Sequence, residues 1–157
     1  MVKKGIKFVI LTLLCYLLQS TASEYLSIGD VAPNIALAFI AITSVAMGRK
    51  YAFFMSLTVG YLMEIMAPPM NYLYLILYPV CGMIGAFFFS DKSERKLEEE
   101  RSLGKRGGNL NAHLRTVLAS LTSVLVFEGV HLLYTYLNGV PLDAEHWQRA
   151  AVAVLYT

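Results

Sequence analysis

Long apolar stretches, separated by short polar joints, constrain this chain more than any other feature of its sequence. A bilayer core of about 30 Å requires roughly 20 apolar residues in a helix, because lipid cannot satisfy exposed backbone groups. Only 15% of the 157 residues are charged, whereas an ordinary soluble domain has about 25%. The sequence therefore predicts an all-α, polytopic membrane protein, a single membrane domain of about six transmembrane helices. We expect these helices at residues 6–25, 33–48, 51–67, 73–89, 114–137 and 147–157.

The first and last stretches each allow two interpretations. Residues 6–25 follow a basic start and end in small residues, which suits either a spanning helix or a signal peptide. We expect the helix to be retained, because the rest of the chain is equally apolar. Residues 147–157 reach only about 16 Å as a helix, which is half a crossing. This helix is either re-entrant or incomplete in this chain, and we expect the second.

Orientation follows from the distribution of Lys and Arg, since basic flanks are retained on the cytoplasmic side of a membrane. With the N-terminus in the cytoplasm, every Lys and Arg except Arg149 falls on that side. This arrangement makes residues 90–113 a cytoplasmic charged loop. Its charged segment, which includes Arg95, Lys96, Glu99 and Arg101, is either a solvated, ion-paired linker or a docking site for a cytoplasmic protein.

Several functional classes are disfavoured by composition and by the absence of their motifs. The formal net charge is only +2, so the chain has no broad basic surface for nucleic acid. Cys15 and Cys81 lie in separate apolar stretches and form no CxxC motif. The sequence also has no GxxxxGK[ST], HExxH or GxGxxG motif. We therefore expect neither an enzyme nor a bound cofactor or metal.

Three ionisable residues fall inside the predicted spans. Glu64 and Glu128 each lie roughly 18 Å from the inner end of their helix, and His131 lies one turn beyond Glu128. The three could form one intramembrane polar cluster. An interhelical hydrogen-bond or packing role, a transport or proton-relay role, and a partner contact all remain open. The ExxH spacing alone is a weak metal signal.

Small residues recur at four-residue spacing within the predicted helices, as in Ser56 with Gly60 and Gly82 with Ala86. Such pairs let two helices approach closely in lipid. They serve either packing within this bundle or the docking of a foreign transmembrane helix, and the sequence does not separate the two.

A motif extends across the third and fourth stretches. Gly60 and Glu64 precede an Ala-Pro-Pro turn at Pro68 and Pro69, and a Tyr-x-x-x-Gly-x-x-Gly pattern then ends in Gly82 and Gly85. This hairpin resembles that of the rod shape-determining protein MreD family, and the similarity extends over nearly the whole chain. The acid in that family is usually Asp, and a common glycine after the turn is replaced near Asn71.

The resemblance implies a non-enzymatic, multi-pass subunit of the bacterial cell membrane that belongs to the cell elongation machinery. Its direct partner would be MreC, a single-span protein with a large outer domain. MreC would connect it to the RodA polymerase, to a penicillin-binding transpeptidase and to MreB filaments. The residues of the hairpin motif, Gly60, Glu64, Pro68, Pro69, Gly82 and Gly85, are then candidates for partner contact or helix packing.

Two other functions remain as alternatives. The MreD family is similar in architecture to the substrate-binding subunits of energy-coupling-factor vitamin transporters. Such a subunit would bind its ligand on the outer side, lined here by Tyr72, Tyr74 and Glu128. An ion or proton carrier that uses Glu64 and Glu128 would need a continuous polar path, for which few groups are available.

Overall fold

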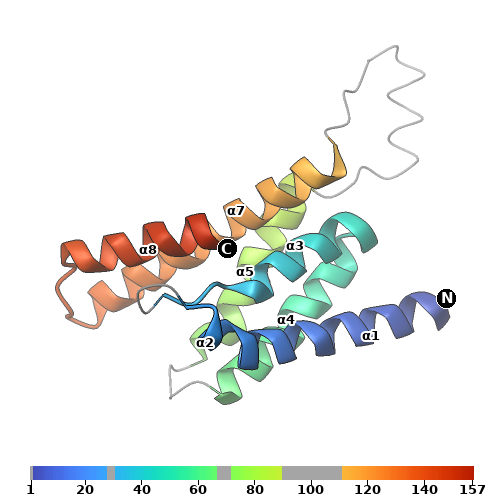
Figure 1. The fold of residues 1–157 in the computed structure, drawn as a ribbon, viewed down its shortest axis with the longest axis horizontal. Helices are drawn as coiled ribbons and strands as arrows, with labels where there is room; N and C mark the ends of the chain where they lie inside the picture. The colour runs from blue at the N-terminus through green and yellow to red at the C-terminus, as the bar shows by residue number, and fades with distance from the viewer. Residues whose placement is uncertain (1, 28–30, 67–71, 90–110) are drawn as a thin grey trace, which may run out of the picture.

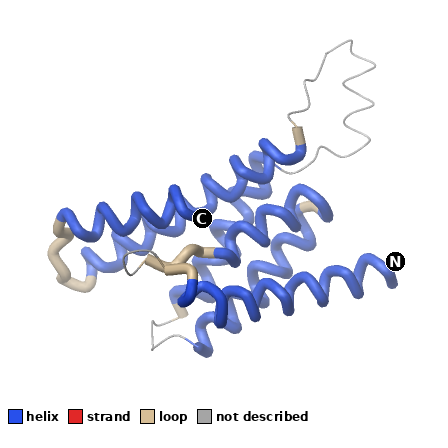
Figure 2. Tube along the Cα trace, in the orientation of Figure 1, coloured by secondary structure: helices blue, strands red, loops and turns tan. Residues whose placement is uncertain are grey.

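A computed structural model describes residues 2–27, 31–66, 72–89 and 111–157, which fold as helices joined by short connections (Figures 1 and 2). The predicted all-α fold is confirmed, and six of the helices have at least 13 residues. In chain order the elements are α1 (Val2–Leu17), the π-helical segment η1 (Leu18–Ala22), α2 (Ser23–Tyr25), α3 (Ile35–Met47), α4 (Arg49–Met66), α5 (Leu73–Phe89), α7 (Ala112–Leu137) and α8 (Ala144–Tyr156).

Local chemistry explains where α3 begins and ends. The Asn34 side chain caps the helix by accepting a hydrogen bond from the amide of Leu37 at 3.3 Å. At the other end Gly48 has a φ of 96°, a backbone conformation that glycine adopts without steric cost. Arg49 begins α4 directly after it, so α3 and α4 form a tight helical hairpin.

The order of the helices in space differs from their order in the chain, because α1 packs mainly against α4, and α3 packs against α4, α5 and α7. Figure 1 shows that successive long helices reverse direction, with α1 along one side of the bundle and α8 along the other. The starts of α1, α4 and α7 therefore lie toward one end of the bundle. Arg49, Lys50 and Arg115 belong to the first turns of α4 and α7, and Lys7 lies in the second turn of α1. The described basic residues other than Arg149 thus gather toward one end.

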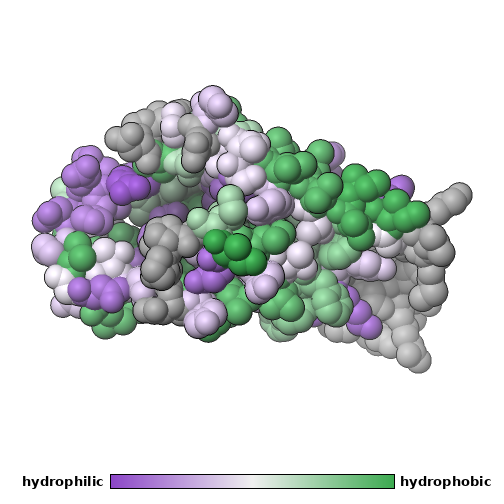
Figure 3. Space-filling view, turned by 90° about the horizontal axis from the view of Figure 1, so that it is seen from below, coloured by the Kyte–Doolittle hydropathy of each residue, from purple (hydrophilic) through white to green (hydrophobic). Residues whose placement is uncertain are grey.

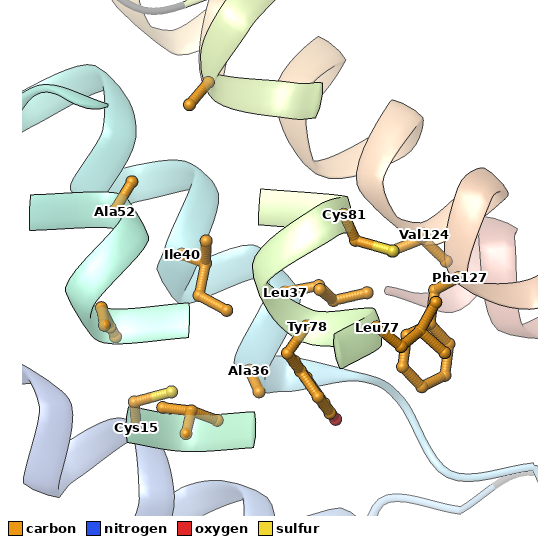
Figure 4. Close-up of a cluster of buried hydrophobic side chains, with 13 residues drawn as sticks. Cys15, Ala36, Leu37, Ile40, Ala52, Leu77, Tyr78, Cys81, Val124 and Phe127 are labelled. Carbon is orange, nitrogen blue, oxygen red and sulfur yellow. The ribbon is translucent and has the colours of Figure 1, made fainter. Parts of the chain in front are cut away.

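The core forms where α3, α4, α5 and α7 meet, and Cys15 of α1 joins it. Figure 4 shows Leu37, Tyr78 and Phe127 converging from α3, α5 and α7. The ring of Tyr78 lies 5.3 Å from that of Phe127, measured between centroids. Aromatic pairs at this separation add to the stabilisation that comes from burial alone.

The three glycines of the hairpin motif stand where helices approach most closely. A Cβ on Gly60 would lie 2.9 Å from the carbonyl oxygen of Tyr74, and one on Gly82 would lie 2.9 Å from Cγ2 of Ile40. At Gly85 an added Cβ would lie 2.9 Å from the carbonyl oxygen of Ala119. These glycines are thus packed inside the bundle against α5, α3 and α7 respectively, which is the internal-packing interpretation of the small-residue spacing.

Large apolar side chains cover the outside of the bundle, whereas several small hydroxyl residues lie within it. Phe87 and Phe88 are 63% and 69% exposed, while Ser56 is fully buried and Ser123 is 1% exposed. The Ser123 hydroxyl donates to the carbonyl of Cys81 at 3.0 Å, so this buried polar group is satisfied. Figure 3 shows broad hydrophobic surface along the bundle and hydrophilic side chains gathered toward the end where α7 and α8 join.

Among the residues that the structure describes, two helical segments have the length and composition needed to cross a membrane, Gly5–Ala22 and Ala112–Leu137. Only 11% of the first and 28% of the second is buried, which differs from the mostly buried core helix of a soluble protein. The helices α3 and α5 are apolar but shorter. The length of α3 is limited to 13 residues by the Asn34 cap and by Gly48, and α4 begins with two basic residues.

Candidate functional site

A cavity of about 690 Å³ lies among α7, α8, the start of α3, the start of α5 and the segment around η1. Its volume is within the range of roughly 300–1,000 Å³ that is typical of ligand pockets. The side chains that line it are of two kinds, an aromatic and apolar group and a polar group. The polar group comprises Gln19, Ser20, Ser23, Asn34, Glu128, His131, Thr135, His146 and Arg149.

The aromatic wall is held by ring contacts among Tyr74, Tyr78 and Phe127. Tyr74 stacks on Phe127 with 6.2 Å between centroids and 8° between planes, and Tyr78 tilts against both rings. His131 contacts Phe127 edge to face at 6.4 Å. These contacts join two long helices, α5 and α7, and they give the cavity an aromatic side.

Hydrogen bonds to other parts of the chain hold several of the polar lining residues. Gln19 accepts a hydrogen bond from the amide of Ala36 at 2.9 Å, which satisfies a free donor at the start of α3. The side-chain oxygen of Asn34 accepts a hydrogen bond from the Tyr78 hydroxyl at 3.3 Å. The backbone amide of Asn34 donates to the hydroxyl of Thr157 at 3.0 Å. These side chains join η1, α3, α5 and the end of α8 around the cavity, and we interpret them as structural.

Four ionisable side chains face the same cavity in a different way. Glu128, His131, His146 and Arg149 line it, and within the described part of the chain none of them has a hydrogen bond or ion pair with the protein. Nδ1 of His146 is buried and without a partner. Arg149 is nevertheless close enough to Glu128 and His131 to interact electrostatically with both. The cavity therefore presents one acid, one guanidinium and two imidazoles to whatever occupies it.

Glu64 has a different role from Glu128. Its two carboxylate oxygens accept hydrogen bonds from the backbone amides of Tyr72 and Tyr74, at 2.9 and 2.8 Å. A negative group is favoured there because these amides lie at the N-terminus of α5. Tyr72 has a φ of 63°, a left-handed conformation that a glycine would adopt more easily. Glu64 thus connects the end of α4 to the start of α5.

The structure distributes the predicted polar cluster over two places. Glu128 and His131 line the cavity together, as their spacing on one helix face suggests, whereas Glu64 is not among the lining residues. The interhelical hydrogen bonds of Glu64 correspond to one of the three roles left open by the sequence. Tyr74 connects the two places, since its amide binds Glu64 and its ring lines the cavity.

Other predicted site residues fall elsewhere. Gly60, Gly82 and Gly85 lie in the interfaces between helices described above. Pro68 and Pro69, and the charged residues Arg95, Lys96, Glu99 and Arg101, lie outside the described residues. Tyr72, which the ligand-binding alternative placed in the pocket wall, is not among the lining residues.

Sequence reasoning missed Arg149 and His146 as residues of this site. Both lie on one face of α8, where His146, Arg149, Ala150 and Ala153 all line the cavity. The spacing of three, four and seven residues was a readable signal of a single helix face. The spacing did not indicate which residues this face meets, because they lie on another helix, between Phe127 and Thr135 of α7.

The arrangement can bind polar and charged groups through side chains. Within the described residues, no three His, Cys, Asp or Glu side chains come together as metal ligands. Comparisons with protein-family models, with curated proteins and with solved structures gave no match.

Proposed function

We propose that this chain is a multi-pass protein of the bacterial cell membrane whose six long helices all enter or cross the bilayer, with its N-terminus in the cytoplasm. The observation that supports membrane insertion is the distribution of side chains, with Phe87 and Phe88 outside and Ser56 and Ser123 inside. A soluble monomer rarely exposes contiguous apolar surface of this kind, whereas helices in lipid pack through small residues. The orientation is supported by the basic residues gathered at one end.

The proposed biochemical role is that of a non-catalytic scaffold of the cell elongation and peptidoglycan synthesis machinery, as in the MreD family. The observation that carries this role is how the hairpin motif is used. Gly60, Gly82 and Gly85 serve close packing, and Glu64 caps the neighbouring helix. Because the motif residues pack helices together and cap α5, they hold a helical hairpin in one conformation. Such a hairpin suits a scaffold better than a catalyst.

The proposed direct partner is a single-span, MreC-like membrane protein. This partner would connect the chain to RodA, to a transpeptidase and to MreB filaments. Since the motif glycines are buried against neighbouring helices, they are not available for docking a foreign helix. The outer face of α1 is available, because it is apolar and the helix is mostly exposed. Its exposed apolar residues are Ile6, Val9, Ile10, Leu13, Leu14 and Leu17.

A second candidate function is favoured by the cavity. A substrate-binding subunit of a vitamin transporter would need a pocket of this size with a few convergent polar groups, and Tyr74 and Glu128 line the pocket as that alternative requires. The scaffold role does not by itself explain why four ionisable side chains face the cavity.

Affinity purification of the tagged, full-length chain from gently solubilised membranes of its own cells tests the two roles together. Mass spectrometry of the eluate would record both proteins and small molecules. We expect a single-span, MreC-like protein with components of the cell wall polymerase. A vitamin-sized ligand together with an ATPase module, and no such single-span protein, would contradict the scaffold role and establish the second candidate.

A further inference from the structure

We propose that the cavity binds a zwitterion, with the ligand's ammonium group at Glu128 and its acidic group at Arg149. This inference goes beyond the scaffold role, and it specifies a ligand class for the second candidate function. Its test reads out ligand binding by the isolated chain, so that it succeeds or fails independently of any partner protein.

The first step in the argument is the placement of two opposite charges. Glu128 belongs to α7 and Arg149 to α8, and both line the same cavity. They are close enough to interact electrostatically, yet within the described residues neither forms an ion pair closer than 4.0 Å. Glu128 is half-buried, so its charge is costly to leave without a partner, whereas Arg149 is exposed and lines the cavity from its solvent side. A ligand that carries both charges would complete both pairs at once.

The second step concerns the two imidazoles beside these charges. His131 lies three residues after Glu128 on α7, and His146 lies three residues before Arg149 on α8. Each histidine is therefore about one turn from its charged neighbour, on the same helix face. A neutral imidazole can donate one hydrogen bond and accept another, and Nδ1 of His146 is buried without a partner. The imidazoles can thus satisfy the remaining polar atoms of each end group.

The third step concerns the body of the ligand. Tyr74 and Phe127, whose rings stack on each other, line the cavity together with the apolar side chains of Met63, Met66 and Leu132. Such a lining favours an apolar or aromatic body, through area burial and stacking. The complete ligand is therefore amphiphilic, with a zwitterionic head and an apolar body.

Two sources supply this chemistry in a bacterial membrane. One is the headgroup of phosphatidylethanolamine, which carries an ammonium and a phosphate on an apolar lipid. The other is a free amino acid with an aromatic side chain, such as L-phenylalanine. The two differ in whether the ligand is supplied by the bilayer or by the aqueous phase.

The experiment uses the full-length chain in nanodiscs of phosphatidylglycerol, a lipid whose headgroup has no ammonium group. Native mass spectrometry after titration with phosphatidylethanolamine tests the lipid source, and isothermal titration calorimetry with L-phenylalanine tests the soluble source. We expect saturable, one-to-one binding of at least one of these probes. Binding of neither probe would overturn the proposal.

Probes that carry only one of the two charges test the zwitterion directly. Phenethylamine retains the ammonium and aromatic ring of phenylalanine, and 3-phenylpropanoate retains the carboxylate and ring. If L-phenylalanine binds, we expect each half-probe to bind at least about tenfold more weakly, the effect of one charge-assisted hydrogen bond. If only the lipid binds, phosphatidic acid, which lacks the ammonium, takes the place of the half-probes. Equal binding by a probe with one charge would overturn the zwitterion.

Matched variants assign the two ends of the ligand. Glu128→Gln and Arg149→Gln each remove one charge from the cavity, and each should weaken binding of the zwitterion by about tenfold or more. The controls Glu145→Gln and Lys50→Gln make the same charge changes at exposed positions outside the cavity and should bind as the wild type does. Wild-type affinity in both cavity variants would contradict the assignment.

Discussion

The Glu64 carboxylate binds the amides of Tyr72 and Tyr74 at the first turn of α5, so an acid predicted to lie within a span is held by backbone donors. This arrangement requires no cationic partner, because two amides and the positive end of the helix macrodipole stabilise the negative charge. The sequence predicted the depth of Glu64 along its helix. The partners could not be predicted, because they depend on how the chain turns between α4 and α5.

Replacing Glu64 tests this capping role. Glu64→Ala leaves both amides without their acceptor and should lower the free energy of unfolding by about 1–3 kcal/mol. Glu64→Gln retains one acceptor oxygen and should have a smaller effect. Thermal unfolding of the purified protein in detergent measures both, with Glu145→Ala on α8 as the exposed control. A melting temperature unchanged in Glu64→Ala would show that the turn is held by other contacts.

At the scale of the elements, the sequence predicted where the helices lie along the chain better than it predicted which helices pack against each other. Residues 73–89 form a helix with the predicted bounds, whereas the predicted stretch 6–25 is divided among α1, which ends at Leu17, η1 and α2, and α8 begins at Ala144 instead of residue 147. Hydrophobic length and turn residues determine such bounds locally. Which small residue meets which helix depends on tertiary packing. Gly85 and Gly129 are both glycines within apolar helices, yet only Gly85 is packed against a neighbour.

Replacing each of these two glycines by alanine should change the stability of the protein in opposite directions. Gly85→Ala places a methyl group against the carbonyl oxygen of Ala119 and the hydroxyl of Ser123, and should destabilise the contact between α5 and α7 by about 1–3 kcal/mol. Gly129→Ala meets nothing within 4 Å and should stabilise α7 by about 0.5–1 kcal/mol. Melting temperatures in detergent should fall for the first variant and rise for the second. Changes of the same sign would contradict the packing described for α5 and α7.

At the scale of the whole molecule, the amount of apolar sequence predicted a membrane bundle, and the many large apolar side chains exposed on the outside of the bundle support it. The cavity could not be predicted, because it is formed by residues from both ends of the chain, from Gln19 to Ala153. Sequence periodicity describes one helix at a time, whereas a cavity depends on how several helices diverge. In the sequence, the polar residues that line it were visible only as scattered exceptions in apolar stretches.

The most direct test of this account is the side of the membrane on which each end of the bundle lies. Lys50→Cys marks the joint between α3 and α4, and Asn138→Cys marks the turn after α7; Cys15 and Cys81 are buried, so the wild type serves as the unlabelled control. A membrane-impermeant maleimide is added to intact cells that express each variant. We predict labelling of Asn138→Cys in intact cells and of Lys50→Cys only after the cells are broken. Equal labelling of both variants in intact cells, or recovery of the protein in the soluble fraction, would contradict the membrane-spanning bundle.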